Sequence, residues 1–275
     1  MTIAYASTPI TDRIMRLSDG SDVCTYLVVG DKRALLVDTG YGFRGLRSYV
    51  ESLLQGKPYD VVITHGHVDH AAGAAEFDTA YMHPADLELN VRHTTIEFRR
   101  AMLSTTSAEL IADISDDAFV PTRSDFLPLE DRQTFNLGDL TVCLFHVPGH
   151  TQGMMVPVVL EERVALFGDA CGVGTLIVFE EASTVTEYRE SLLAFKQHEG
   201  LWDRVLRQHG TCESPKSILS TNIELCSLIM ACEDDAFPAE FAGMKTLMAK
   251  AVDPVSRARI DGGEGNIMYI EEKIR

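Results

Sequence analysis

A dense cluster of metal-binding side chains, placed directly after a short apolar run, constrains this chain more than any other feature. Residues 59–64 read YDVVIT, which is typical of a strand buried on both faces, and residues 65–70 read HGHVDH. Residues two apart in an extended segment point the same way, so His65 and His67 can reach one ion together. Asp69 and His70, where the chain turns into a helix, can face a second ion. Because zinc, iron and manganese accept imidazole and carboxylate ligands, this run predicts a metal centre at a strand end.

Three further candidate ligands also follow apolar runs directly. His150 lies in the sequence VPGHT, Asp169 in FGD and His209 in QHG. A lone histidine is usually a surface or core residue. Several histidines and aspartates that all follow apolar runs are hard to explain by chance. The seven residues are enough for two ions, with one carboxylate shared between them. The predicted metal ligands are His65, His67, Asp69, His70, His150, Asp169 and His209.

The hydrophobic pattern predicts an α/β fold. Residues 22–29 and 33–38 are two apolar runs joined by a Gly-Asp turn, and residues 43–55 have helical periodicity. A strand, helix, strand order of this kind indicates a mixed or parallel sheet covered by helices. We expect further strands at 79–82, 133–137, 140–146, 154–160, 164–167, 204–208 and 266–270, and a helix at 185–195 that opens with a Thr184/Glu187 capping box. The expected organisation is a single domain, 1–275, with a helical insertion at about 84–123 and a helical extension at about 211–260.

The composition limits the partners. With 41 acidic and 24 basic residues, the formal net charge of -17 argues against a nucleic acid or an anionic membrane, although it leaves room for a small-molecule substrate. No run reaches the roughly 18 apolar residues that a membrane-spanning helix needs, and the N-terminus does not resemble a secretory signal. The six cysteines are dispersed, which is typical of reduced thiols, so we expect a cytoplasmic protein. The oligomeric state stays open, a homodimer included.

The motifs together resemble those of the metallo-β-lactamase superfamily. The matching segments are VDTG at 37–40, THGHVDH at 64–70, PGHT at 148–151, GD at 168–169 and HG at 209–210. The resemblance implies a four-layer αβ/βα sandwich with metals at one edge. It also implies that His65, His67 and His150 hold one ion, that Asp69, His70 and His209 hold the other, and that Asp169 bridges them. A hydroxide between the ions would be the nucleophile.

Details within the superfamily favour one branch. Antibiotic-degrading members of the commonest kind have cysteine where this chain has Asp169, so the pattern is closer to glyoxalase II and the acyl-homoserine lactonases. It departs from the lactonases at Ala170-Cys171-Gly172, where they have a tyrosine, and from glyoxalase II in lacking matching basic residues in 211–275. We therefore expect a binuclear metal-dependent hydrolase of a small-molecule ester, thioester or lactone. A small-molecule phosphodiesterase and an iron-dependent oxygenase are the alternatives, and a non-catalytic relic is disfavoured because no ligand is missing. Zinc is the expected metal, with iron and manganese left open.

The remaining candidates are weighed against ordinary structural roles. Asp69 and Asp169 are the predicted catalytic residues, and Asp38, at the end of a strand, is expected to orient the metal loop or a ligand histidine. Cys171 and Tyr188 are expected in the core, because a thiolate ligand would be redundant and Tyr188 falls on the buried face of its helix. The patterns assign structural or surface roles to His83, His93, His146 and His198, and leave Met102, Met154 and Met155 open between pocket lining and core packing. The insertion and the C-terminal extension are expected to wall the groove and select the substrate.

Overall fold

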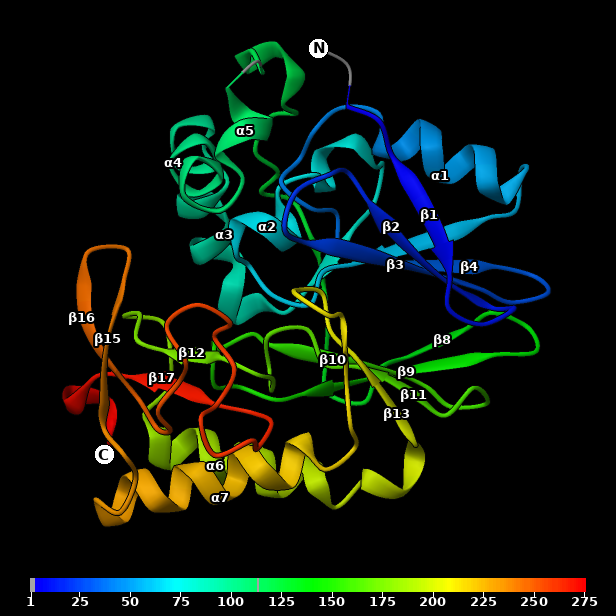
Figure 1. Cartoon of the computed structure of the whole chain (residues 1–275). Coiled ribbons are helices and arrows are strands. Elements are labelled where there is room, and N and C mark those ends of the chain that lie inside the picture. Colours follow the sequence, from blue (N-terminus) through cyan, green and yellow to red (C-terminus); the bar gives the residue numbers. More distant parts are fainter. Residues whose placement is uncertain (1–2, 113) are drawn as a thin grey trace.

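Two large β-sheets pack face to face in the computed structural model, which describes residues 3–112 and 114–275 (Figure 1). Residues 1–2 and 113, which the predicted domain and its insertion include, lie outside the described residues. The first sheet has seven strands in the order of the sequence. Its strands are β1 (Ala6–Pro9), β2 (Ile14–Ser18), β3 (Cys24–Val29), β4 (Ala34–Val37), β5 (Tyr59–Val62), β6 (Tyr81–Met82) and β7 (Leu127–Pro128). Strands β1 to β4 pair antiparallel, and β4 to β7 pair parallel.

The second sheet has six strands in the order β14-β13-β11-β10-β9-β8. Its strands are β8 (Thr134–Asn136), β9 (Thr141–His146), β10 (Met155–Val159), β11 (Val164–Leu166), β13 (Arg204–Leu206) and β14 (Glu213–Ser214). The β11–β13 pair is parallel and the others are antiparallel, as expected where a helix connects the first pair and short turns connect the rest.

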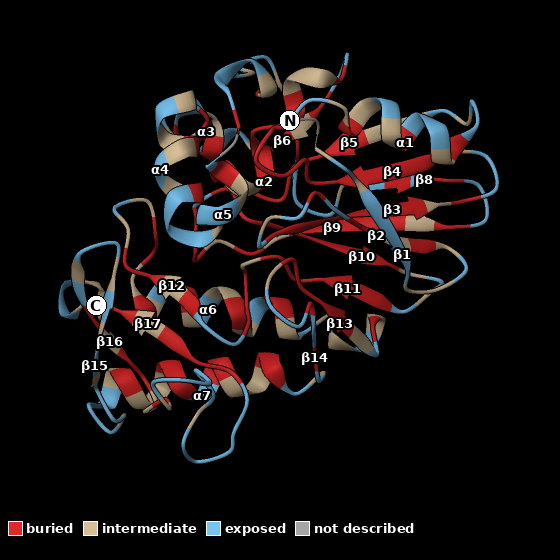
Figure 2. Cartoon of the chain, turned by 45° about the horizontal axis from the view of Figure 1, so that its top comes forward, coloured by how far each residue is buried: buried red, intermediate tan, exposed pale blue. Residues whose placement is uncertain are grey.

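Strands buried on both faces explain why two sheets and two helical layers form. In β4, Leu35 and Val37 pack into the core between the sheets, whereas Leu36 faces helix α1 (Leu46–Leu54) on the outer side. Side chains alternate in the same way along β9, where Leu144 faces the first sheet and Phe145 faces the helices of the second. The burial pattern in Figure 2 follows these layers. The sandwich predicted from the sequence is therefore confirmed.

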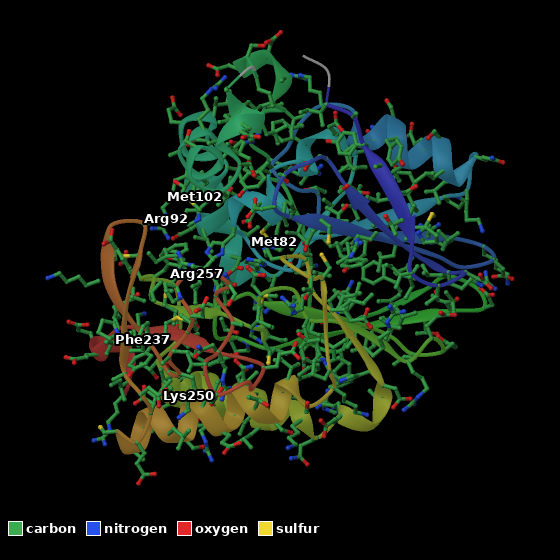
Figure 3. All side chains as sticks on the ribbon, viewed as in Figure 1. Met82, Arg92, Met102, Phe237, Lys250 and Arg257 are labelled. Carbon is green, nitrogen blue, oxygen red and sulfur yellow. The ribbon has the colours of Figure 1, made fainter. Side chains whose placement is uncertain are left out.

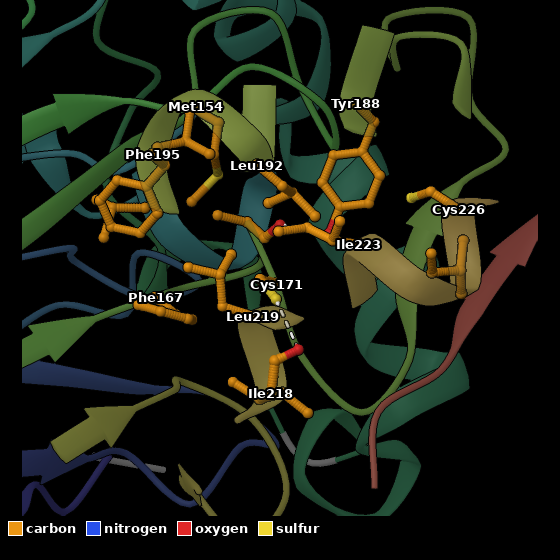
Figure 4. Close-up of a cluster of buried hydrophobic side chains, with 14 of the residues drawn as sticks. Met154, Phe167, Cys171, Tyr188, Leu192, Phe195, Ile218, Leu219, Ile223 and Cys226 are labelled. Atoms are coloured by element: carbon orange, nitrogen blue, oxygen red, sulfur yellow. Dashed lines mark hydrogen bonds between the residues drawn. The ribbon is translucent and has the colours of Figure 1, made fainter. Parts of the chain in front are cut away.

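Two long helices cover the outer face of the second sheet. Helix α6 (Val185–Lys196) begins at a Thr184/Glu187 capping box and lies beside α7 (Ile218–Ala231). Tyr188 and Leu192 are among the α6 side chains that enter the apolar cluster under this sheet (Figure 4). The 3-10 turn η4 (Glu199–Leu201) follows α6, and the chain then passes through β13 and β14 before α7 begins.

Short helices lie beside the end of the first sheet that carries the metal motif (Figure 1). They are α2 (Val68–Ala71), α3 (Leu87–His93), α4 (Ile96–Thr106) and α5 (Ala108–Ile111), with the 3-10 turns η1 (Ala74–Glu76), η2 (Pro84–Asp86) and η3 (Asp116–Ala118). Phe119 stacks on Phe43 with ring centroids 5.1 Å apart, and buried Arg99 donates hydrogen bonds to the carbonyl oxygens of Thr94 and Val120. The Phe119–Phe43 contact fastens the 84–123 segment to the sandwich, and the Arg99 hydrogen bonds hold the segment together internally.

The C-terminal region contains strands where the sequence pattern predicted helix. A small third sheet has the order β12-β17-β16-β15, with β12 (Thr175–Ile177), β15 (Phe237–Phe241), β16 (Met244–Met248) and β17 (Ile267–Tyr269), and the 3-10 turn η5 (Glu271–Lys273) follows it. The prediction of a helical extension over about 211–260 was therefore wrong beyond α7. Pro238 disfavours a helix, and Ala242 and Gly243 both have positive φ, which suits the two-residue turn of a hairpin.

Candidate metal centre

All seven predicted ligands meet at one edge of the sandwich, on loops that leave the ends of strands. The segment 65–70 follows β5, and His150 lies in the β9–β10 connection. Asp169 follows β11 and His209 follows β13. Residues that are far apart in the sequence thus come together because both sheets end at the same place.

The ligand atoms form two adjacent groups. Those of His65, His67 and His150 lie within 4.8 Å of one another, as do those of Asp69, His70, Asp169 and His209. The Nε2 atoms of His65 and His150 are buried and have no hydrogen-bond partner among the described residues. A buried nitrogen without a partner is costly, and a cation between these side chains would satisfy both lone pairs. The residues present therefore fit divalent metal ions.

Asp169 belongs to the second group and also lies beside the first. Its Oδ2 atom lies 3.5 Å from His150 Nε2 and 3.7 Å from His70 Nε2, and its Oδ1 atom lies 3.7 Å from His209 Nε2. One carboxylate placed in this way can contribute an oxygen to each of two ions. This is the position expected for a bridging ligand.

The two groups differ in charge. Burial lowers the pKa of His150 to about 4 and that of His65 well below its usual value, so these imidazoles offer neutral lone pairs. Burial also disfavours the charged form of His209, but Asp169 and Asp69 outweigh it and raise the pKa of His209 to about 9. In the second group, carboxylates and imidazolium thus compensate one another, and a divalent cation can take the place of the protons.

Four of the five histidines point Nε2 at the centre and are held from behind through Nδ1. Nδ1 of His65 lies 3.1 Å from Thr64 Oγ1, and Nδ1 of His150 lies 2.9 Å from the carbonyl oxygen of Leu176. Nδ1 of His209 lies 3.1 Å from the carbonyl oxygen of Asp22. Nδ1 of His70 lies 2.8 Å from Asp38 Oδ2. Such partners fix the tautomer and the direction of each ring.

Asp38 lies behind the metal loop, as the sequence suggested. Its carboxylate is fully buried and accepts from the Thr64 amide and hydroxyl, from His70 and from the Gln208 side chain, at 2.7–3.0 Å. Asp38 thereby connects the end of β4 with loops from both sheets. Its φ of 65° is unusual for aspartate and is consistent with a conformation held by these bonds.

Asp86 was not singled out from the sequence, yet it fastens two ligand loops to each other. Its buried carboxylate accepts from the amides of Gly66 and Gly153 and from the Thr151 hydroxyl, at 2.7–2.8 Å. The approach is so close that a Cβ on Gly66 would lie 2.7 Å from the Asp86 carbonyl oxygen. Like the ligands, Asp86 comes soon after a strand, and that position was the available signal.

Other candidates fall in the core or away from the centre. Tyr188 is buried and donates to the carbonyl oxygen of Ala170 at 2.8 Å, and Cys171 is buried with a pKa raised by desolvation (Figure 4). Met154 and Met155 are buried in the core, whereas Met102 lies on the insertion helices, as does Arg92 (Figure 3). His83 stacks on His146 at 4.1 Å, and His198 packs against Phe145. The sequence assigned His93 a surface or structural role. In the structure its ring stacks on that of the ligand His67, with centroids 5.1 Å apart.

Known proteins resemble this chain in both sequence and fold. The family model described as "Metallo-beta-lactamase superfamily" matches residues 19–199. Acyl-coenzyme A thioesterase MBLAC2 from Homo sapiens is 28% identical over 233 residues, which cover 74% of this chain and 81% of that protein. Atrochrysone carboxyl ACP thioesterase from Aspergillus fumigatus is 29% identical over 149 residues, covering 53% of this chain but 28% of that protein. The solved structure of a metallo-beta-lactamase from Pontibacter korlensis superposes with a TM-score of 0.61 at 14% identity, covering 80% of this chain and 98% of that chain.

Within the described residues, the helices are too short or too polar to span a bilayer.

Proposed function

We propose that this chain, which belongs to the metallo-β-lactamase superfamily, hydrolyses thioesters of small molecules at a centre of two divalent ions. The family match and the thioesterase relatives support a metal-dependent hydrolase. The observation that carries the proposal is the position of Asp169, whose two oxygens lie beside both ligand groups. A site for one ion would not need a carboxylate in that place.

The ligand sets follow the two groups of side chains. His65, His67 and His150 would hold the first ion, and Asp69, His70 and His209 would hold the second, with Asp169 shared. We propose zinc, because imidazole-rich sites with a carboxylate suit it well. Bound divalent ions of this kind supply an activated water near neutral pH and stabilise the developing oxyanion.

Asp69 and Asp169 are the proposed catalytic residues of the centre. Asp69 Oδ2 lies 3.1 Å from His209 Nε2 and 3.6 Å from His70 Nε2, so this carboxylate is fixed at the edge of the second group. From there it would orient the attacking water as well as hold the ion. Because the nucleophile is water, no side chain needs to form a covalent intermediate, which agrees with the burial of Cys171.

Two observations support a thioester as the substrate. The human relative and the Aspergillus relative are both named as thioesterases. Aromatic side chains also lie beside the ligands: the Phe179 ring is 5.8 Å from that of His67, and the Phe241 ring is 5.7 Å from that of Phe179. Phe241 stands at the end of β15, so these two half-buried rings lie between the first ligand group and the hairpin. Apolar rings of this kind suit contact with an acyl chain.

Turnover of a substrate panel by the zinc-loaded protein tests the proposal. The panel comprises acyl-coenzyme A thioesters of graded chain length, an aryl ester, a lactone and a phosphodiester, with acid release followed by a pH indicator for all four and thiol release as a second readout for the thioesters. We expect the thioesters to give the highest kcat/KM. Asp69→Ala and Asp169→Ala should each lower turnover by roughly a thousandfold or more, since metal and chemistry are lost together.

Cys171→Ala is the matched control and should stay within about tenfold of wild type, because its role is packing. Faster turnover of the phosphodiester than of any thioester would contradict the proposed substrate class. Trapping of an acyl group on a side chain during the first turnover would contradict the proposed nucleophile.

A further inference from the structure

His67 is hydrogen-bonded through the opposite ring nitrogen from the other ligand histidines. In His65, His70, His150 and His209, Nδ1 has a protein partner and Nε2 faces the centre. In His67 it is Nε2 that has the partner, Glu181 Oε1 at 3.1 Å. A neutral imidazole carries one proton, so a proton on Nε2 that is donated to Glu181 leaves the lone pair on Nδ1. The carboxylate therefore decides which nitrogen of His67 is free for the first ion.

Glu181 comes from a loop that is fixed on several sides. The loop lies between β12 and α6, and the Lys273 ammonium donates to the carbonyl oxygens of Glu180 and Ala182. The Gln152 side chain, from the loop that carries His150, donates to the Glu181 carbonyl oxygen at 3.1 Å. The Glu181 side chain is only 13% exposed. A carboxylate held in this way has little freedom to turn elsewhere.

A second contact restrains the His67 ring from the helical insertion. The His93 ring of α3 lies nearly parallel to it, with centroids 5.1 Å apart and an angle of 11°. The Phe98 ring of α4 stacks on the far side of His93 at 4.3 Å. His93 Nε2 is 3.9 Å from Glu181 Oε1, which is too far for a hydrogen bond. His93 therefore acts on His67 through stacking.

We propose that Glu181 is a positioning residue of the metal centre, which fixes the tautomer and the direction of His67, and that His93 supports the same ring by stacking. The proposal rests on the metal centre proposed above and adds a residue that the ligand pattern does not contain. Partners of this kind typically change metal affinity 10- to 100-fold when they are removed. The group His67, His93 and Glu181 is thereby explained as a support for the first ion and needs no ion of its own.

Two substitutions separate hydrogen bonding from charge. Glu181→Gln keeps an oxygen that accepts from His67 Nε2, whereas Glu181→Leu keeps the size and removes the acceptor. Glu180→Leu is the matched control, because Glu180 is the exposed neighbour whose side chain makes no hydrogen bond or ion pair with the ligands among the described residues. Zinc affinity is measured by competition with a chromogenic chelator, and the metal-free protein is examined by long-range ¹H–¹⁵N NMR of the histidine rings. Thermal unfolding of each variant checks that it folds.

We expect wild type, Glu181→Gln and Glu180→Leu to bind the first zinc within about threefold of one another, and Glu181→Leu to bind it roughly 10- to 100-fold more weakly. His67 should be protonated on Nε2 in the first three proteins and a mixture of tautomers in Glu181→Leu. His93→Phe should retain the affinity, because a ring is still stacked on His67, whereas His93→Ala should weaken it.

Several results would overturn this role. Equal zinc affinity and an unchanged tautomer in Glu181→Leu would show that the carboxylate positions nothing. A loss in Glu181→Gln as large as that in Glu181→Leu, or Glu181 bound directly to zinc in a crystal structure of the loaded protein, would make it a ligand instead. Failure of the wild-type protein to bind zinc at all would contradict the proposed metal centre and is therefore distinguishable from these results.

Discussion

Single buried carboxylates organise the ligands around this centre. Asp38 receives hydrogen bonds from Thr64, His70 and Gln208, and Asp86 joins the loop that contains Gly66 to the loop that contains His150. An aspartate in such a position accepts through both oxygens and cannot be replaced by a residue that also donates. The geometry of the ligands thus depends on residues that touch no metal.

Asp38→Asn tests this dependence. Whichever way the new amide turns, its NH₂ group meets an N–H donor, either the Thr64 amide or those of His70 and Gln208. We expect the metal-free protein to lose about 1–3 kcal/mol in the free energy of unfolding, because a buried donor is left unpaired. Zinc affinity at the second group should fall roughly 10- to 100-fold. Urea unfolding and chelator competition measure the two effects.

Asp60→Asn is the control, since Asp60 pairs with Arg33 at a partly exposed site on the same sheet. It should cost less than about 1 kcal/mol and leave zinc binding unchanged. Wild-type zinc affinity in Asp38→Asn would show that His70 does not need this partner.

At the scale of elements, we expect the β15–β16 hairpin to be the part of the C-terminal region that meets a substrate. Phe241 at its end contacts Phe179, which contacts the ligand His67. Phe241→Ala should lower kcat/KM for long acyl chains by about tenfold, because roughly 1.5 kcal/mol of apolar contact is lost. Turnover of the acetyl thioester, which does not reach the hairpin, should stay unchanged.

Phe237→Ala offers a comparison on the same strand, since residues four apart share a face and Phe237 pairs with Met248 at the far end of the hairpin (Figure 3). It should leave the chain-length preference as it is. An equal loss for short and long chains in Phe241→Ala would mean that the hairpin supports the fold and not the acyl group.

The sequence predicted the strands of the sandwich well because they are buried on both faces and bounded by turns. β3, β4, β9 and β10 appear within a residue or two of their expected bounds. The strands β1 and β2 were not expected, because β1 is exposed throughout and its pattern resembles a loop. The sequence pattern predicts helix over β15 and β16, since their half-buried residues give a weak alternation that Pro238 and Gly243 alone do not outweigh.

The residues of the candidate site divide in the same way, into those that a local sequence pattern predicts and those that it does not. Ligands could be predicted because each lies directly after a strand and has the chemistry that metals require, and the structure brings all seven together. Glu181 and His93 could not be predicted, because their role depends on contacts between segments that are far apart in the sequence. Glu181 lies in an ordinary turn before a helix, and His93 ends α3. Hydrogen bonds between distant loops leave no periodic trace in a sequence.

On the scale of the whole molecule, the centre lies at the boundary of two halves. The first sheet supplies the ligands of residues 65–70, and the second supplies His150, Asp169 and His209. Neither half has a complete site alone, so metal should bind the docked sandwich and not the unfolded chain. Binding of that kind stabilises the folded state by mass action.

We propose that hydrolysis needs two ions, held by these seven side chains. Titration of the metal-free protein with zinc, with thioester turnover as the readout, tests it most directly. Turnover should be negligible without zinc and should rise until two equivalents per chain have been added, then level off. Full turnover at one equivalent, or in the absence of zinc, would contradict the need for two ions.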